Sequence, residues 1–174
     1  CFVEAVGACA VIVTSVERAK DLPQPPVYIM AAQSGNTDHP SLGYMGSELG
    51  ECFSKRLGKR LYEQAVIGPK DVDIAELHDP FSWMVLPQLE DFGFCKEGEA
   101  GDFVKNGAIE LGGKLPVNTH GGSLAEGEME GLAQVVEAVI QLRGQAGPRQ
   151  VKGAEVALCT SHEFDRGSAL ILRR

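Results

Sequence analysis

The stretch Ile74-Ala75-Glu76-Leu77-His78-Asp79-Pro80-Phe81 decides the fold class. Its first four residues form a short, mostly apolar run that is typical of a strand, and the run ends at His78. Residues 82–92 then have the pattern of a helix, which Gly93 closes. A strand that passes through a polar turn into a helix is the basic unit of a layered α/β fold.

Strands and helices alternate outward from this unit in both directions. Apolar and β-branched runs predict strands at residues 8–14, 27–32, 74–77, 155–159 and 168–172. Helical periodicity predicts helices at residues 16–22, 47–65, 82–92 and 131–142. Ser47 is the expected N-cap of the second helix. We expect the last helix to pack through its apolar stripe, Leu132, Val135, Val136, Val139 and Ile140. Polar and glycine-rich residues predict a loop at 33–46 and an irregular segment at 94–113.

The order of these elements predicts one α/β domain over residues 1–174, with a five-stranded mixed sheet between layers of helices. Polar loops leave the predicted strands at His78, Thr119 and Thr160. In open α/β sheets, ligand sites gather where strands pass into loops. The chemically capable side chains of the chain are therefore expected on these loops.

The composition excludes several classes of protein. The net charge is -8, which argues against nucleic acid because phosphate binding needs a basic face. No apolar run approaches the roughly 20 residues that a membrane-spanning helix requires. The five cysteines are odd in number and scattered, which indicates no disulfide framework and favours a cytoplasmic location.

Four stretches together resemble one known family. They are Gly7-Ala8-Cys9-Ala10-Val11-Ile12-Val13-Thr14-Ser15-Val16-Glu17-Arg18-Ala19, Ala75-Glu76-Leu77-His78-Asp79-Pro80-Phe81, Leu89-Glu90-Asp91-Phe92-Gly93-Phe94 and Pro116-Val117-Asn118-Thr119-His120-Gly121-Gly122. In this order they are similar to the C-terminal half of the thiolase superfamily, in its sterol-carrier-type, lipid-transfer-protein-like branch. The resemblance spans essentially the whole chain and implies that an N-terminal half with the nucleophilic cysteine is absent.

The resemblance implies three catalytic residues. His78 falls at the position that stabilises a thioester oxyanion, and Cys159 falls at the late cysteine that acts as acid or base. Glu128 occupies the place of the histidine that activates the nucleophile, with the neighbouring glycines in register. The turn that contains Asn118, His120, Gly121 and Gly122 is the expected substrate-binding segment.

Each assignment has a plainer alternative. Asp79 is expected to cap the helix that begins near Ser82 rather than to act in catalysis. Glu128 stands between Glu126 and Glu130 and would equally suit a solvated acidic surface. Cys159 would equally suit inert packing. No histidine pair has the spacing of metal ligands, so no metal is expected.

The leading hypothesis is the C-terminal half of a thiolase-like protein that acts on acyl-CoA thioesters, by acyl transfer or by retro-aldol cleavage of a carbon–carbon bond. The alternative is a non-catalytic acyl- or sterol-binding scaffold subunit. The coenzyme A thioester is the expected substrate, with no cofactor. The expected partners are the missing N-terminal half, a second copy in the full protein, and an OB-fold protein with a zinc ribbon. The isolated chain is expected to be inactive.

The resemblance also carries a geometric expectation. His78 and Cys159 should face one pocket with their side chains within about 10 Å of each other, which is a few strand spacings. Glu128 should reach the same pocket if it replaces the histidine, and should point to solvent if it is surface charge.

Overall fold

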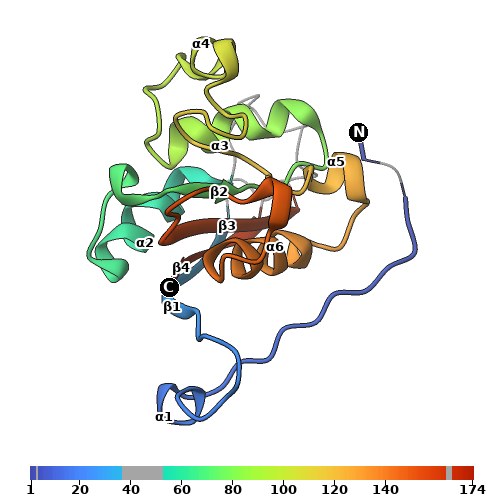
Figure 1. Cartoon of the computed structure of the whole chain (residues 1–174). Coiled ribbons are helices and arrows are strands. Elements are labelled where there is room, and N and C mark those ends of the chain that lie inside the picture. Colours follow the sequence, from blue (N-terminus) through green and yellow to red (C-terminus); the bar gives the residue numbers. More distant parts are fainter. Residues whose placement is uncertain (3, 37–52, 164–165) are drawn as a thin grey trace.

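The computed structural model describes residues 1–2, 4–36, 53–163 and 166–174. Its centre is a four-stranded mixed sheet in the order β1-β4-β3-β2 (Figure 1). The strands are β1 (Tyr28–Asn36), β2 (Ile74–Glu76), β3 (Val156–Glu163) and β4 (Arg166–Arg173). β4 pairs antiparallel with both β1 and β3, whereas β2 pairs parallel with β3. The predicted α/β class and mixed sheet are confirmed.

Helices cover both faces of this sheet. The α-helices are α1 (Val16–Ala19), α2 (Leu57–Ala65), α3 (Val85–Asp91), α4 (Ala100–Phe103), α5 (Gly122–Glu126) and α6 (Leu132–Leu142). The 3-10 turns are η1 (Phe53–Arg56), η2 (Pro69–Asp71), η3 (Ser82–Met84), η4 (Lys105–Gly107) and η5 (Gly147–Arg149). α2 and α3 lie on one face and α6 on the other (Figure 1).

The prediction of a fifth strand at residues 8–14 is wrong for this chain. The segment is extended but pairs with none of the described strands, and Figure 1 shows it running apart from the sheet. Its side chains face outward, with Ile12 93% and Val13 72% exposed. A strand needs a hydrogen-bonded neighbour. The outer edge of β2 is instead covered by a single parallel bridge between Ala75 and Val117.

Three of the other strands, β1, β3 and β4, are longer than the sequence indicates, whereas β2 ends one residue earlier, at Glu76. β1 continues to Asn36, into residues predicted as a loop; the rest of that loop, and Ser47, lie outside the described residues. β3 continues past Cys159 and Thr160 to Glu163, so the predicted exit at Thr160 is wrong. The polar ends of β3 and β4 pair with each other, from Thr160 with Ala169 to Glu163 with Arg166. This pairing is not visible in a hydrophobicity pattern.

The observed helices also begin and end at residues other than those predicted. The predicted helix at 47–65 begins in the described residues as η1 and becomes α2 at Leu57. The helix at 82–92 is η3 followed by α3. The irregular segment at 94–113 contains α4 and η4, and α5 was not predicted at all. These missed elements are three to five residues long, too short for a periodic pattern.

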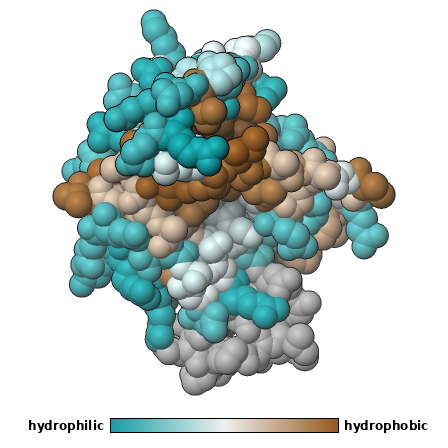
Figure 2. Space-filling model, turned by 90° about the horizontal axis from the view of Figure 1, so that it is seen from below, coloured by the Kyte–Doolittle hydropathy of each residue, from teal (hydrophilic) through white to brown (hydrophobic). Residues whose placement is uncertain are grey.

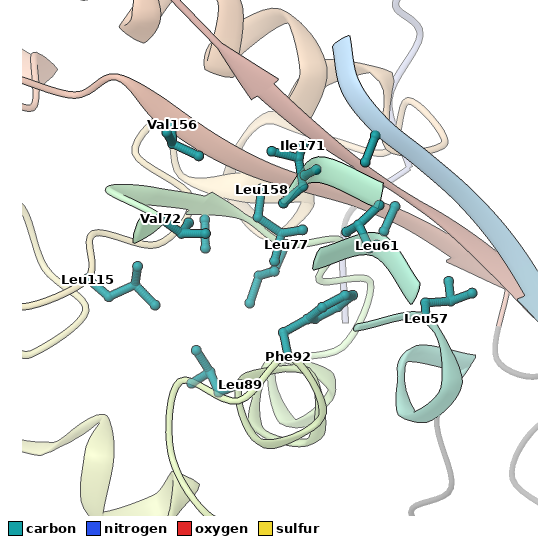
Figure 3. Close-up of a cluster of buried hydrophobic side chains, with 14 of the residues drawn as sticks. Leu57, Leu61, Val72, Leu77, Leu89, Phe92, Leu115, Val156, Leu158 and Ile171 are labelled. Atoms are coloured by element: carbon teal, nitrogen blue, oxygen red, sulfur yellow. The ribbon is translucent and has the colours of Figure 1, made fainter. Parts of the chain in front are cut away.

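The sheet separates two hydrophobic clusters. Alternate residues of a strand point to opposite faces, so Leu158 and Ile171 join the cluster under α2 and α3, while Ala157 and Leu172 join the cluster under α6. The first cluster is the larger, and Figure 3 shows Phe92 and Leu89 of the α3 region pointing toward the strand residues.

α6 packs through a face that matches the predicted one only in part. Its fully buried residues are Gln134, Glu137, Ala138, Gln141 and Leu142. The expected stripe is only partly buried, although Val135 and Val139 do touch the smaller cluster. Polar side chains thus face the sheet, and the row of Leu132, Val136 and Ile140 is left half-exposed. Figure 2 shows hydrophobic side chains gathered across the middle of the face seen from below.

The carboxylate of Asp91, at the end of α3, gives a prediction for stability. It accepts a 2.6 Å hydrogen bond from Ser54 Oγ, and burial raises the pKa of Asp91 to about 6. The fold therefore favours the protonated acid, and ionisation costs stability as the pH rises from 4 to 6. We expect Asp91→Asn to stabilise the chain by about 1 kcal/mol at pH 7, after allowance for solvent screening.

Urea unfolding at pH 7 and at pH 4 tests this prediction. The gain should be absent at pH 4, where both side chains are neutral. Asp102→Asn is the matched control, because its side chain is 82% exposed. An equal effect of the two substitutions at pH 7 would contradict the assignment.

Candidate active site

The structure places His78 and Glu128 in direct contact. His78 follows the end of β2, and Glu128 follows α5. Nε2 of His78 lies 2.8 Å from Oε2 of Glu128, and the side chains are 3% and 13% exposed. An ionised carboxylate only accepts hydrogen bonds, so Nε2 carries a proton toward it. The backbone N–H of Glu130 donates to Oε1 at 2.6 Å. Glu128 is therefore a held carboxylate at the edge of the interior, not a freely solvated charge.

A closed ring of hydrogen bonds fixes the backbone of His78. Its N–H donates to Thr160 Oγ1 at 2.8 Å, and the Thr160 hydroxyl donates to Gln88 Oε1 at 2.7 Å. Gln88 Nε2 in turn donates a hydrogen bond to the carbonyl oxygen of His78 at 2.9 Å, which closes the ring. Gln88 and Thr160 are buried. The ring joins β2, β3 and α3 at one point, so the position of His78 follows from the packing of all three.

His162 of β3 encloses the other side of the His78 ring. Nδ1 of His78 lies 3.0 Å from the His162 carbonyl oxygen and accepts from the His162 backbone N–H at 3.2 Å. The imidazole of His162 stacks on Phe53, with ring centroids 4.7 Å apart. Burial, and then the charge of His78, lower the pKa of His162 to about 3. Sequence reasoning gave His162 no role; the pairing of β3 with β4 is the signal that was missed.

Asp79 caps α5, and the prediction that it caps the helix near Ser82 is wrong. Asp79 Oδ1 accepts from the backbone N–H of Ser123 at 2.7 Å, whereas η3 begins without a side-chain cap. Burial raises the pKa of the Asp79 carboxyl, against the hydrogen bond from Ser123, which lowers it. Asp79 is the sequence neighbour of His78, and Glu128 follows α5 closely. The hydrogen bond from Ser123 to Asp79 therefore fixes the position of Glu128 relative to His78.

The expected substrate-binding turn also holds α5 against the end of β2. Asn118 has a left-handed backbone with φ 49°, and its Oδ1 accepts from Leu77 N at 2.7 Å. Gly121 and Gly122 also have positive φ, at 108° and 67°. A Cβ on Gly122 would overlap the Asp79 carboxylate. The residues therefore shape the approach of α5 to β2, and their contact with substrate stays a prediction.

His120 lies in a buried polar network behind this turn. Its Nδ1 is 3.1 Å from Glu76 Oε2, with side-chain exposures of 3% and 0%, although the two atoms are not aligned as a full hydrogen bond. The Thr119 hydroxyl lies 2.8 Å from Glu76 Oε1 and 2.7 Å from Glu137 Oε1, and its single proton serves one at a time. Burial would lower the pKa of His120, but Glu76 raises it above its usual value.

Cys159 has the environment of a packing residue. It is fully buried in the cluster under α6, and Sγ lies 3.8 Å from the carbonyl of Gln134. Burial, and then the charge of Glu76, raise the pKa of the thiol well above its usual value, so the thiolate is disfavoured at neutral pH. Cys159 pairs with Glu76 in the β2–β3 register, on the strand beside the one that leads into His78. Its role as a catalytic acid or base stays a prediction.

A cavity of about 600 Å³ lies near the His78–Glu128 pair at the end of the sheet. It lies between β1 and the β3–β4 hairpin, and its lining includes Ser34, Asn36, Glu130, Ser161, His162 and Arg166. Glu130 and His162 are the residues whose backbones hold Glu128 and His78. His78 and Glu128 are not among the lining residues, so the cavity lies one residue away from the pair, behind His162 and Glu130.

Within the described residues, no cluster of three or more His, Cys, Asp or Glu side chains has the geometry to hold a metal ion. None of the helices in the described ranges is long and apolar enough to cross a membrane.

The family model for the thiolase C-terminal domain-like group matches residues 34–170. The chain is 45% identical over 147 residues to a steroid side-chain-cleaving aldolase of Thermomonospora curvata, covering 83% of this chain and 38% of that protein. It is 43% identical over 175 residues to the 17-hydroxy-3-oxo-4-pregnene-20-carboxyl-CoA lyase of Mycobacterium tuberculosis, covering 99% and 45%. The solved structure titled Ltp2-ChsH2(DUF35) aldolase matches with a TM-score of 0.85 at 40% identity, covering 91% and 42%.

The chain belongs to the thiolase C-terminal domain-like family, in its lipid-transfer-protein-like branch. The expected family and branch are thereby confirmed. The chain spans less than half the length of these relatives.

The packing of Gly122 against Asp79 gives a prediction for the site. We expect Gly122→Ala to destabilise the chain by about 3 kcal/mol, because the new methyl group meets the carboxylate and the backbone is left-handed. Gly153→Ala is the matched control, since Gly153 has φ 79° with no atom within 4 Å of its Cβ position. It should cost only about 1 kcal/mol for the backbone strain. Equal losses in urea unfolding would show that the contact with Asp79 is unimportant.

The His120–Glu76 pair predicts a pH dependence of stability. The pKa of His120 is raised in the folded chain above its usual 6.5, so the pair stabilises the fold fully below pH 6.5 and progressively less as the pH rises through the folded pKa. His120→Asn should remove this part of the slope. Urea unfolding between pH 6 and 9 measures it, with Glu76→Gln as a second variant that should flatten the slope in the same way. Wild-type slopes in both variants would exclude the pair as its source.

Proposed function

We propose that this chain is the C-terminal half of a retro-aldol carbon–carbon lyase that acts on β-hydroxyacyl-CoA thioesters. The observation that carries the proposal is the His78–Glu128 contact, a carboxylate oriented by a histidine near a cavity. The names of two relatives, a steroid side-chain-cleaving aldolase and a 17-hydroxy-3-oxo-4-pregnene-20-carboxyl-CoA lyase, support this class of reaction.

Glu128 is the proposed base. Its carboxylate takes the proton of the β-hydroxyl group, the C–O bond becomes a carbonyl, and the bond between the α- and β-carbons breaks. The electron pair of that bond passes to the thioester as an enolate, and a proton returned to the α-carbon gives the shortened acyl-CoA. The second product is the ketone or aldehyde. Atoms and charge balance without a covalent enzyme intermediate.

His78 acts in this proposal by holding Glu128. Its Nε2–H points at the carboxylate and its Nδ1 is engaged with the backbone of His162. With both ring nitrogens occupied, the arrangement favours a positioning role over the direct oxyanion donation expected from the family resemblance. The enolate oxygen then takes its hydrogen bonds from other donors, which we place in the half that this chain lacks.

Acyl transfer by a thiolase mechanism has less support from the site. A glutamate at the position of the activating histidine disfavours a thiolate because its charge is negative. The thiol of Cys159 is buried and protonated. The first feature disfavours activation of a nucleophilic cysteine in the absent half, and the second disfavours the acid–base role that a thiolase mechanism needs from Cys159 itself.

We place the missing half against the outer face of α6 and the exposed run at residues 11–13. Val11, Ile12 and Val13 are exposed, and the outer residues of α6, Leu132, Val136 and Ile140, are only partly buried by the described chain. The relatives are more than twice as long. The paired names in the Ltp2-ChsH2(DUF35) title support a second polypeptide, which we propose is the OB-fold, zinc-ribbon partner. A homodimer of the full protein and a cytoplasmic location are retained as proposals.

Substitution of Glu128 tests the function directly. In the protein completed with its upstream half and partner, Glu128→Gln should lower kcat for 17-hydroxy-3-oxo-4-pregnene-20-carboxyl-CoA by about 10²- to 10⁴-fold, because the base is lost while the amide keeps the hydrogen bond from His78. The matched control is Glu126→Gln, an exposed glutamate of the same segment, which should leave kcat unchanged. Product formation is followed by mass spectrometry.

Two results would count against the proposal. Full activity in Glu128→Gln would remove Glu128 from the reaction. Tight binding of the thioester with no turnover by the completed wild-type protein would favour the alternative, a non-catalytic acyl- or sterol-binding scaffold.

A further inference from the structure

We propose that His162 is a positioning residue, which fixes the ring of His78 so that its Nε2–H points at Glu128. The inference deepens the proposed function and rests on it for its catalytic meaning, but the geometry concerns this chain alone. No described feature of the proposed reaction uses the side chain of His162, although it is buried and lies beside the cavity.

The contacts of His162 with His78 are reciprocal. The backbone of His162 contacts His78 Nδ1 twice, through its carbonyl oxygen at 3.0 Å and its N–H at 3.2 Å, and the His162 side-chain Nε2 lies 3.2 Å from the carbonyl oxygen of His78. A carbonyl oxygen only accepts, so Nε2 of His162 must carry its proton. The same residue therefore contacts the ring of His78 through its backbone and the backbone of His78 through its ring.

The remaining nitrogen of His162 keeps its ring neutral. Nδ1 is buried and has no hydrogen-bond partner among the described residues. A proton added there would be a buried donor without an acceptor, which is costly. The low pKa of His162 agrees with this. A neutral ring cannot repel an imidazolium at His78, whose edge lies against it with centroids 4.9 Å apart.

Packing holds His162 in this orientation. Its ring stacks on Phe53 at an interplanar angle of 25°, and Gly167 on β4 leaves the space, since a Cβ there would collide with both Phe53 and His162. His162 and Gly167 are register partners in the β3–β4 hairpin. The side chain is thus clamped between η1 and the end of β2, and the clamp sets the distance from its backbone N–H to His78 Nδ1.

Nitrogen-15 NMR of the purified chain tests the inference without any acyl-CoA substrate. The chain has only four histidines, so their ring signals can be assigned by single substitutions. We expect His162 to show one protonated and one bare nitrogen throughout pH 5–8, and His78 to show its proton on Nε2. Titration of His162 within that range would overturn the inference.

Two substitutions separate positioning from packing. His162→Phe keeps the stack on Phe53 but loses the donor to the His78 carbonyl; we expect the His78 ring-nitrogen signals to shift, because the ring is no longer held toward Glu128, and the backbone N–H of residue 162 to exchange about five- to tenfold faster, as for one lost hydrogen bond. His162→Gln keeps a side-chain donor and should restore both readouts. His120→Asn, at the other buried histidine, should change neither.

Each outcome either supports or contradicts the positioning role of His162. Unchanged His78 signals in a folded His162→Phe variant would show that the side chain only packs. If His162→Phe does not fold, the His162→Gln variant still decides, because shifted His78 nitrogen signals there would contradict the role of the donor. If the NMR results are as expected while Glu128→Gln keeps full lyase activity, the positioning of His78 stands and the proposed function fails.

Discussion

The parallel pairing of β2 with β3 is the constraint on which the rest of the structure depends. It places the end of β2 beside Thr160 and His162, so that His78 receives its backbone partners from β3 and α3 at once. The same pairing sets Glu76 beside Cys159 and turns both toward α6. The register of β2 against β3 therefore determines both the geometry of the site and the packing of the core.

Sequence patterns identified the layered class and four of the strands because buried strands and amphipathic helices have strong periodic signals. They failed where structure depends on a partner. The run at residues 8–14 reads as a strand, yet the described sheet offers it no neighbour. The polar ends of β3 and β4 read as loops, yet they pair with each other. The inner face of α6 was predicted only in part, because Glu137 and Gln141 are buried through hydrogen bonds with Thr119, and the partly exposed Arg149 pairs with Glu137.

Candidate site residues followed from family resemblance rather than from periodicity. It brought forward His78 and Glu128, which the structure joins, and Cys159, which lies among apolar neighbours. It could not indicate that Asp79 caps a distant short helix or that His162 encloses His78, because both contacts join residues more than 40 positions apart. Such contacts arise from tertiary packing and leave no local trace in the sequence.

The exposed apolar run at residues 10–13 affects the tendency of the chain to aggregate in solution. Ala10, Val11, Ile12 and Val13 form a short, uncharged, mostly β-branched segment that pairs with none of the described strands, which is the composition that pairs readily with copies of itself in aggregates. If another segment or protein covers these residues, we expect the chain not to aggregate through them. A segment that covered this run, such as the upstream half proposed above, would remove this site of self-association.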